Sequence, residues 1–358
     1  MRVLVTVNCH GVDASAAGGI ALARMMNELG HTVLLQAEPA GPVFIEAARQ
    51  GIEVTGLRLR KSAIATGLIT MKKLVKGFDP DVICTTRADG QTACALAASD
   101  IPLVRIRCDI RKPRTGRLWR IIDRRTDLVV FPSGFMVERG YAGERGGPIE
   151  VIPHPVDTEL FSPVKHMETF PRLLISIGRL SPMKGHRTLI HSLTLLPEDV
   201  CAIIIGSPSQ QSQEELLAFA GDLGVENRLS LPGRIDDIRE ILSKGGIGVV
   251  TSLGSEVVSR AGMEMMSTGL PVLAAATNGL LDLVNDGDTG LLHSPGNYRQ
   301  LAAQAGFLFD NSAMALRMGR RARNICVSGF SYPVIGKIWE EVLQTLSGKE
   351  HLSGLRVP

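Results

Sequence analysis

Short apolar runs alternate with amphipathic helical patterns along the whole chain. An apolar run of about four to eight residues is typical of a buried strand, and apolar positions spaced three and four apart are typical of a helix. Strands alternating with helices imply a parallel sheet covered on both faces. The first half predicts strands over 2–7, 31–37, 81–86, 103–108, 127–132 and 150–156, with helices over 20–30 and 44–51.

The same pattern restarts after a proline-containing segment, residues 153–163. Prolines in such a segment interrupt regular secondary structure and indicate a boundary between structural units. The second half predicts strands over 172–178, 200–206, 228–233, 247–252, 271–276 and 290–295, and helices over 186–196, 210–224 and 238–245.

The two halves predict an α/β protein of two doubly wound, Rossmann-like units that face each other across a cleft. We expect an N-terminal domain over 1–165 and a second domain over 166–330. The remaining segment, 331–358, contains a helix that could belong to either unit. Ligands of doubly wound sheets bind beyond the carboxyl ends of the strands, so the chemistry should lie in the loops that follow them.

Composition supports two domains and excludes several classes of protein. The chain has 358 residues, of which 44% are hydrophobic and 21% charged, enough for two separate cores. No apolar stretch approaches the length of a membrane span, and the apolar N-terminus fits a first strand better than a signal peptide. The six cysteines are scattered without C-x-x-C spacing. These features predict a cytoplasmic protein with reduced thiols.

Positive charge is concentrated in the first half of the chain. Residues 1–150 carry a net charge of +6, and residues 151–358 carry −3. The segment 103–125 holds nine basic residues against Asp109 and Asp123. Such a cluster suits a phosphorylated lipid, a membrane surface or nucleic acid, although it could also be a solvated face. Because only Trp119 offers an aromatic platform, we do not expect nucleic acid as a partner.

The segment GSEVVSRAGMEMMSTGLPV holds the strongest candidate site. Glu256 follows a predicted strand, Ser259 is placed to cap a helix, and Glu264 lies one to two turns inside that helix. The amides of 257–259 and the helix N-terminus would form a positive end. Carboxylates beside such donors suit a polyhydroxylated ligand that carries phosphate. Two glutamates at this spacing also occur by chance, and one near a helix start can simply complement the dipole.

The segment SIGRLSPMKGHRTLI forms a second candidate site. Its strand ends at Gly178, and Arg179 and Lys184 follow in the loop before a helix. Two cations beside a helix N-terminus can bind a diphosphate, or they can be solvated loop residues.

The loop after the first strand forms a third candidate site. Gly18 and Gly19 precede the predicted helix and would allow a ligand to approach the backbone, unless they are ordinary loop residues. The spacing does not match G-x-G-x-x-G, which argues against a nicotinamide site. His10 lies in the same loop, and a lone histidine there is more often polar surface.

The three sites together resemble the retaining glycosyltransferases of family 4, which have the two-domain GT-B fold. VIPHPVDTELFSP resembles the family's inter-domain stretch VIPNGVDTxxFxP, and ISIGRLSPMKGHRTLIHSL resembles VGRLxxxKGxxxLIxAL. The run from PGRIDDIREI to DGDTGLL resembles the family's E-x7-E region. The similarity covers the second half in order and the first half more loosely, and it extends to bacterial members that build lipopolysaccharide or other envelope glycans.

The resemblance implies a role for each matching residue. Arg179 and Lys184 would hold the donor diphosphate, Glu256 the transferred sugar, and Glu264 the ribose hydroxyls. Catalysis would depend on Arg179, Lys184 and Glu256. The remaining donor contacts would come from Gly18, Gly19, Gly178, Gly233, Arg234, Val257, Val258 and Ser259. The acceptor side would include His10, Cys108, Asp109 and Arg111.

Three positions depart from the family pattern. Val257-Val258-Ser259 stands where members commonly have G-F-G after the first glutamate, so sugar packing would differ. Cys108-Asp109 occupies the neighbourhood of a sugar-contacting histidine of the first domain. His154 replaces the usual asparagine of PNGVD, a change that we interpret as structural.

The implied reaction is sugar transfer from a nucleotide sugar to an acceptor hydroxyl with retained configuration, in lipopolysaccharide or other envelope glycan synthesis. We expect no cofactor and no obligatory metal, because Arg179 and Lys184 can replace a divalent ion. The expected partners are the nucleotide sugar and an anionic lipid-linked or glycan acceptor, with peripheral contact at the inner membrane face. The alternatives are a nucleotide-sugar epimerase or a phosphorylase on the same fold, and a binding protein that has lost catalysis.

Overall fold

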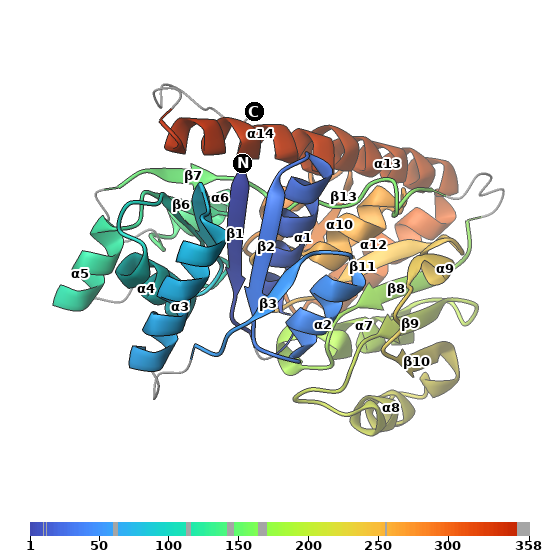
Figure 1. The fold of residues 1–358 in the computed structure, drawn as a ribbon. Coiled ribbons are helices and arrows are strands. Elements are labelled where there is room, and N and C mark those ends of the chain that lie inside the picture. Colours follow the sequence, from blue (N-terminus) through green and yellow to red (C-terminus); the bar gives the residue numbers. More distant parts are fainter. Residues whose placement is uncertain are drawn as a thin grey trace. The chain divides into compact units, whose positions relative to one another are not determined.

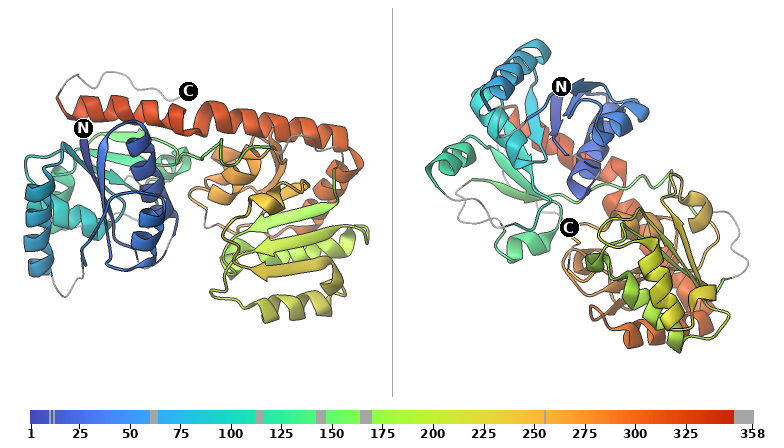
Figure 2. Two further views of the ribbon diagram at one scale, coloured as in Figure 1. Left: turned by 45° about the vertical axis from the view of Figure 1, so that its right-hand side comes forward. Right: turned by 90° about the horizontal axis from the view of Figure 1, so that it is seen from below.

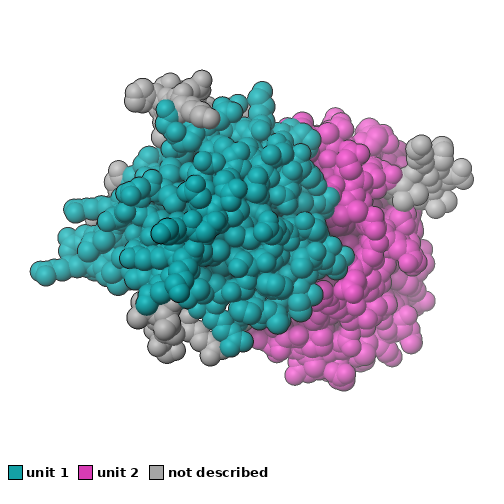
Figure 3. Space-filling model, in the orientation of Figure 1, with its two compact units in different colours: residues 1–155, 332–358 teal, residues 156–331 magenta. Residues whose placement is uncertain are grey.

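The computed structural model describes residues 1–9, 11, 13–59, 64–111, 116–141, 147–163, 170–254 and 256–348. The chain forms two compact units, coloured separately in Figure 3. Unit 1 comprises 1–155 and 332–358, and unit 2 comprises 156–331.

The sheet of unit 1 has seven parallel strands in the order β3-β2-β1-β4-β5-β6-β7 (Figure 1). Side chains alternate between its two faces, so that Val3 and Val5 enter one core while Leu4 enters the other. The strands are β1 (Arg2–Val7), β2 (Thr32–Ala37), β3 (Val54–Gly56), β4 (Val82–Thr85), β5 (Leu103–Ile106), β6 (Leu128–Phe131) and β7 (Ile149–Val151).

Helices cover both faces of this sheet. The layer on one face consists of α1 (Ala14–Glu28), α2 (Pro42–Arg49) and α14 (Tyr332–Leu346). The layer on the other face consists of α3 (Ile64–Phe78), α4 (Ala88–Ala97) and α5 (Arg117–Arg124). A short helix, α6 (Gly134–Glu138), follows β6.

The last helix, α14, belongs to unit 1. Ile335, Trp339 and Leu343 are buried in the core beneath α1, although they come from the far end of the chain. The unit boundary lies after Pro155 rather than at residue 165, because Val156 forms a bridge with Ser331 and Phe161 packs against a core of unit 2.

Unit 2 repeats the doubly wound architecture with six parallel strands in the order β10-β9-β8-β11-β12-β13. Several of them run side by side in the left view of Figure 2. The strands are β8 (Leu173–Ile177), β9 (Cys201–Ile205), β10 (Leu229–Gly233), β11 (Ile247–Val250), β12 (Val272–Ala275) and β13 (Gly290–His293).

Two cores lie on the two faces of this second sheet. The first packs beneath α7 (His186–Ser192), α8 (Gln213–Asp222) and α12 (Tyr298–Asp310). The second packs beneath α9 (Arg239–Leu242), α10 (Arg260–Ser267) and α11 (Leu280–Leu283). Helix α13 (Ser312–Ile325) contributes Met318 to the first core and Ala322 to the second. The doubly wound α/β class that the sequence predicts is confirmed.

The structure corrects the start of the first helix. Asp13 caps α1 by accepting a hydrogen bond from the Ala16 amide at 3.0 Å, so the helix begins at Ala14 rather than at residue 20. Gly18 and Gly19 therefore lie inside the helix and not in a loop before it. The sequence analysis also missed the short strand β3 and the helices α3, α4, α5, α6, α11, α12 and α13.

None of the helices among the described residues is long and apolar enough to span a membrane.

Candidate active site

The candidate site of unit 2 lies at the point where the strand order of its sheet reverses. β8 and β11 are neighbours, but the chain continues from β8 toward β9 and from β11 toward β12. The loops that follow β8 and β11 therefore diverge at the carboxyl edge. Doubly wound sheets bind their ligands at such a point. These two loops contain Arg179 and Lys184 on one side and Glu256 on the other.

Close backbone packing joins the two loops. Gly185 has a φ of +68°, and a side chain there would place its Cβ 2.1 Å from the Thr251 carbonyl oxygen. The Thr251 hydroxyl donates to the Lys184 carbonyl at 2.9 Å, and the Leu253 amide donates to the Met183 carbonyl at 2.8 Å. Only glycine combines this conformation with this approach, which explains the K-G pair of the sequence motif.

Lys184 and Glu256 form an ion pair across the two loops. The Lys184 ammonium donates to Glu256 Oε1, and the Ser252 hydroxyl donates to the same oxygen at 2.7 Å. Glu256 is only 5% exposed. A buried carboxylate needs such partners, because an unpaired buried charge is costly. The structure thus joins two residues that the sequence analysis assigned to separate sites.

Arg179 occupies the same loop as Lys184 and is exposed. The Gly178 amide before it donates to the Ile205 carbonyl at 2.9 Å, which continues the sheet into the loop. His186 Nε2 lies 3.1 Å from the Arg179 carbonyl oxygen, and burial lowers the pKa of His186. A neutral imidazole can donate from Nε2 to this carbonyl and hold the turn that carries Arg179.

The start of α10 has the geometry predicted from the sequence. The Ser259 hydroxyl accepts from the Gly262 amide at 3.2 Å, which confirms Ser259 as the helix cap. Val257 and Ser259 are buried, and Val258 is half-buried. Within the described residues, the amides of Val257 and Val258 have no hydrogen-bond partner. These amides lie just before the cap residue of α10, and a helix N-terminus is suited to an anionic or hydroxylated ligand.

Glu264 lies in the second turn of α10 and is 6% exposed. Arg260 Nε lies 3.0 Å from Glu264 Oε1. Burial raises the pKa of Glu264, and the charge of Arg260 opposes that shift. The two glutamates therefore have different partners, Lys184 for Glu256 and Arg260 for Glu264.

Gly233 and Arg234 lie at the end of β10, the edge strand of the sheet. Gly233 belongs to the same carboxyl edge, since its carbonyl accepts from the Gly206 amide at 2.9 Å. Arg234 is exposed and pairs with Asp236 at 3.1 Å. Among the described residues, no hydrogen bond or ion pair joins Arg234 to Lys184 or Glu256.

The structure gives Gly18 and Gly19 of unit 1 a packing role. A Cβ on Gly18 would lie 2.2 Å from His154 Cε1, and one on Gly19 would lie 2.5 Å from Val7 Cγ2. Gly18 thus allows α1 to approach His154, and Gly19 allows it to approach β1. The predicted open loop is wrong because the helix extends past both glycines.

Cys108 of unit 1 is buried and lies against the half-buried His154, with Sγ and Nε2 3.3 Å apart. Burial lowers the pKa of His154 to about 4 and raises the pKa of Cys108 to about 12. Both groups are therefore neutral near pH 7, which makes a thiolate–imidazolium pair unfavourable. His154 thus contacts one of the candidate acceptor-side residues, Cys108.

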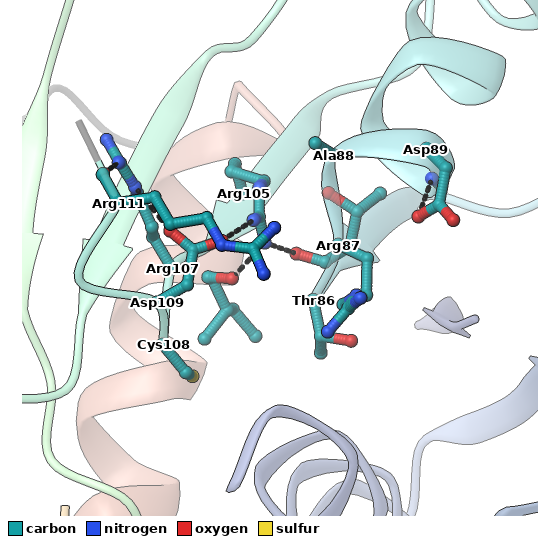
Figure 4. A network of polar contacts seen from close by, with 12 residues as sticks. Thr86, Arg87, Ala88, Asp89, Arg105, Arg107, Cys108, Asp109 and Arg111 are labelled. Atoms are coloured by element: carbon teal, nitrogen blue, oxygen red, sulfur yellow. Dashed lines mark hydrogen bonds and ion pairs between the residues drawn. The ribbon is translucent and has the colours of Figure 1, made fainter. Parts of the chain in front are cut away.

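Asp109 and Arg111 lie in a network of arginines at the end of β5 (Figure 4). Arg107 Nε lies 3.4 Å from Asp109 Oδ1, and Arg107 also donates to the Arg111 carbonyl. Arg105 is buried and donates to the Thr85 carbonyl at 3.3 Å. Burial lowers the pKa of Arg105 to about 10. His10 lies outside the described residues.

Several residues at the candidate site of unit 2 were not assigned by the sequence analysis. Ser252 contacts Glu256, Arg260 contacts Glu264, and His186 contacts the loop of Arg179. His186 directly follows the K-G pair, so its position in the motif was the one available signal. Among the described residues, no group of three or more His, Cys, Asp or Glu side chains is placed to hold a metal ion.

Two family models match the chain in tandem. Glycosyltransferase Family 4 matches residues 20–160, and Glycosyl transferases group 1 matches residues 158–325. The D-inositol 3-phosphate glycosyltransferase of Mycolicibacterium gilvum is 31% identical over 162 residues, which are 41% of this chain and 36% of that protein.

A second curated relative is the lipopolysaccharide core biosynthesis glycosyltransferase LpsE of Rhizobium meliloti. It is 26% identical over 171 residues, which are 48% of this chain and 49% of LpsE. The matched region thus spans less than half the length of either relative.

A structure of Anabaena HepE in complex with UDP has a TM-score of 0.84 and 22% identity, over 96% of this chain and 100% of HepE. A structure of HepE with UDP-glucose has a TM-score of 0.82 at the same identity and the same coverage of both chains. At this level of identity the similarity concerns the fold.

The chain therefore belongs to glycosyltransferase family 4, a family of retaining glycosyltransferases, and it has the GT-B fold. The resemblance that the sequence motifs indicated is confirmed.

Proposed function

We propose that the protein transfers a sugar from a nucleoside-diphosphate sugar to an acceptor hydroxyl and retains the anomeric configuration. The observation that carries this proposal is the Lys184–Glu256 ion pair at the strand-order reversal of unit 2. It places a cation and a carboxylate side by side, next to the N-terminus of α10. A donor with a diphosphate and a hydroxylated sugar matches that combination.

The departing diphosphate is the group that the cations would stabilise. Arg179 is exposed and free to reorient, and Lys184 lies within reach of Glu256. We assign both residues to the diphosphate, with the amides of Val257 and Val258 as further donors. Such fixed donors stabilise charge that develops in the transition state.

Glu256 is assigned to the transferred sugar and Glu264 to the ribose. Both known partners of Glu256 contact Oε1, which leaves Oε2 for a sugar hydroxyl. Glu264 is held by Arg260, and carboxylates accept hydrogen bonds from vicinal hydroxyls. Gly178, Gly233 and Ser259 would shape the donor site around these groups. Arg234 would take part only after leaving Asp236.

The proposed chemistry is a same-face displacement. A double displacement would need a carboxylate nucleophile on the opposite face of the sugar. The sequence motifs identify no carboxylate for that role, and the resemblance to family 4 favours transfer on one face. The incoming hydroxyl would therefore attack on the face from which the diphosphate departs.

The acceptor class is inferred from relatives and from charge. Relatives act in lipopolysaccharide core biosynthesis or on inositol 3-phosphate, as their names state. The excess of cations in residues 1–150 suits an anionic acceptor of the same kind. We therefore propose an anionic lipid-linked or glycan acceptor of the cell envelope, reached at the cytoplasmic face of the membrane. Asp109 and Arg111 are candidates for contacts with it.

Titration with UDP, GDP and ADP by calorimetry tests the donor site, and HepE makes UDP the first candidate. We expect one nucleotide to bind at micromolar concentration and to lose affinity in Lys184→Ala. The matching radiolabelled nucleotide sugars, incubated with lipid-linked glycan acceptors, test transfer. Conversion of the donor without an acceptor would indicate an epimerase, and nucleotide binding with no turnover on any acceptor would indicate a binding protein. Either outcome would overturn the proposal.

A further inference from the structure

The two helix layers of unit 1 differ in the charge of their outer surfaces. The layer of α3, α4 and α5, here the α3–α5 layer, exposes seven basic side chains: Lys72, Lys73, Lys76, Arg117, Arg120, Arg124 and Arg125. None of the seven has an ion-pair partner among the described residues. The three helices carry only two acidic residues, Asp89 and Asp123, so the layer has an excess of positive charge.

The layer of α1, α2 and α14 has a mixed and internally paired surface. Arg24 pairs with Glu28 at 2.9 Å, and Arg49 pairs with Glu46 at 2.7 Å. Glu340 and Glu341 of α14 add negative charge beside Lys337. The basic character of unit 1 is thus a property of one face of its sheet.

Exposed apolar side chains accompany the cations of the α3–α5 layer. Leu118 and Ile121 of α5 are 52% and 50% exposed, and Ile69 of α3 is 57% exposed. Leu118 and Ile121 are three residues apart, one helical turn. Arg117, Arg120, Arg124 and Arg125 are the exposed residues around them, whereas Ile122 faces the core. The outer side of α5 is therefore an apolar pair surrounded by arginines.

The combination of exposed cations with exposed apolar side chains indicates which anionic partner fits this surface. A solvated basic face gains nothing from exposed leucine and isoleucine, and a nucleic acid would favour aromatic platforms. An anionic bilayer meets both requirements, because its headgroups attract arginine and its acyl boundary accepts apolar side chains. Figure 1 shows α5 as the last helix of its layer, beside α4.

We infer that the α3–α5 layer docks on an anionic lipid bilayer, with Leu118 and Ile121 inserted at the acyl boundary. This inference deepens the proposed function and rests on its membrane-linked acceptor. It assigns membrane contact to one face of unit 1, and it predicts that Leu118 and Ile121 contribute to the affinity for the bilayer.

Flotation with vesicles of 70% phosphatidylcholine and 30% phosphatidylglycerol tests the inference. We expect binding at about 50 mM salt, a steep loss at about 500 mM, and none to pure phosphatidylcholine. Each cation close to an anionic surface contributes roughly a fivefold factor, so Arg117→Gln with Arg120→Gln should weaken partitioning roughly 25-fold. The control, Arg49→Gln with Lys337→Gln, removes the same charge from the opposite layer and should change partitioning by less than about threefold.

The apolar contribution has its own matched control. Leu118→Gln with Ile121→Gln should weaken partitioning by roughly 10-fold or more. Leu195→Gln with Leu281→Gln changes two side chains of unit 2 that are 51% and 50% exposed, and it should have no effect. Absent binding at low salt, or equal losses in the α5 pair and its control, would overturn the inference.

A nucleotide titration on the same variants separates this inference from the proposed function. We expect the α5 variants to bind the nucleotide like the wild type, because they lie in unit 1 and the donor residues lie in unit 2. Vesicle binding without nucleotide binding would refute the donor site alone. Nucleotide binding without vesicle binding would refute the membrane face alone.

Discussion

The two sheets each reverse their strand order at one point, and the ion pairs at the carboxyl edges there differ in burial. In unit 2 the reversal lies between β8 and β11, and an ion pair between a half-buried lysine and a buried glutamate joins the loops there. In unit 1 it lies between β1 and β4, where Arg87 Nη1 lies 3.4 Å from Asp13 Oδ2. The side chains of that pair are 38% and 41% exposed, whereas those of Lys184 and Glu256 are 24% and 7% exposed.

The ion pair of unit 2 is less exposed than the ion pair of unit 1, and we expect it to be held more rigidly. A buried pair loses hydration and must keep its geometry, whereas an exposed pair exchanges readily with water. The same architecture thus carries a preorganised site in unit 2 and a more open edge in unit 1. A fixed donor site and a variable acceptor site would follow from this difference, and the predictions below test it.

Lys184→Ala should have the largest effect. Turnover should fall roughly 10²–10³-fold, because a fixed cation beside the leaving diphosphate is lost and Glu256 remains buried without it. Arg179→Ala should lower turnover by a similar factor. Lys244→Ala removes an exposed cation of unit 2 and serves as the control. Near-wild-type rates in both Lys184→Ala and Arg179→Ala would contradict the assignment.

His154 should make unit 1 sensitive to acid. Its pKa is about 4 in the folded protein, against about 6.5 in the unfolded chain, so the unfolded chain binds the proton more readily between these values. The contribution of His154 is fully present above pH 6.5 and is lost as the pH falls toward 4, a change of about 3 kcal/mol.

Tryptophan fluorescence follows this unfolding in unit 1, because both tryptophans, Trp119 and Trp339, belong to that unit. Urea unfolding at pH 7.5 and pH 4.5 should show a smaller difference in His154→Asn than in the wild type. His191→Asn, a change in unit 2, should keep the wild-type difference. Equal pH dependence in all three proteins would show that His154 is not the sensor.

Gly18→Ala should destabilise unit 1 by about 1–3 kcal/mol, because the new methyl group would overlap the His154 ring. Gly77→Ala is the matched control, since Gly77 lies in α3 with nothing within 4 Å of the added Cβ. Alanine in an unobstructed helical position is neutral or stabilising. Urea unfolding followed by tryptophan fluorescence measures both variants. If they are equally stable, the contact between α1 and His154 is looser than the structure indicates.

The two glutamates of unit 2 should separate nucleotide binding from sugar transfer. Glu264→Ala should weaken binding of the free nucleoside diphosphate roughly tenfold, the value of one or two lost hydrogen bonds to a charged group. Glu256→Ala should spare nucleotide affinity but impair transfer. Calorimetry with the nucleotide and rate measurements with the nucleotide sugar distinguish the two effects. The reverse pattern would mean that their roles are exchanged.

Arg87→Ala should have the smallest effect on stability, less than about 1 kcal/mol, because its partner Asp13 is exposed. Asp13→Ala should cost more, since Asp13 also caps α1 through the Ala16 amide. Urea unfolding of the two single variants and the double variant isolates the pair energy. A coupling energy between Arg87 and Asp13 as large as that of a buried ion pair would contradict the proposed difference between the two sites.

Much of the local structure of the candidate site in unit 2 could be predicted from the sequence because its signals are local. A strand followed by a basic loop and a helix start is encoded within about fifteen residues, as at 173–187. The Ser259 cap and the position of Glu264 in the helix follow from the same short-range rules. Unit 1 offered no comparable motif, and the one glycine-rich segment was misread because Asp13 caps α1 earlier than the apolar pattern suggested.

The sequence by itself determined the doubly wound architecture and the family, and it indicated the candidate donor residues, since periodicity and short motifs act through neighbouring residues. Only the tertiary structure decided which of these residues meet. Lys184 contacts Glu256 across 72 positions of sequence, Gly18 faces His154, and α14 returns to the core of unit 1. The physical reason is that such contacts depend on strand order and close packing, which bring distant segments together. The same packing decides that Leu118 and Ile121 face outward while Ile122, their neighbour in α5, is buried.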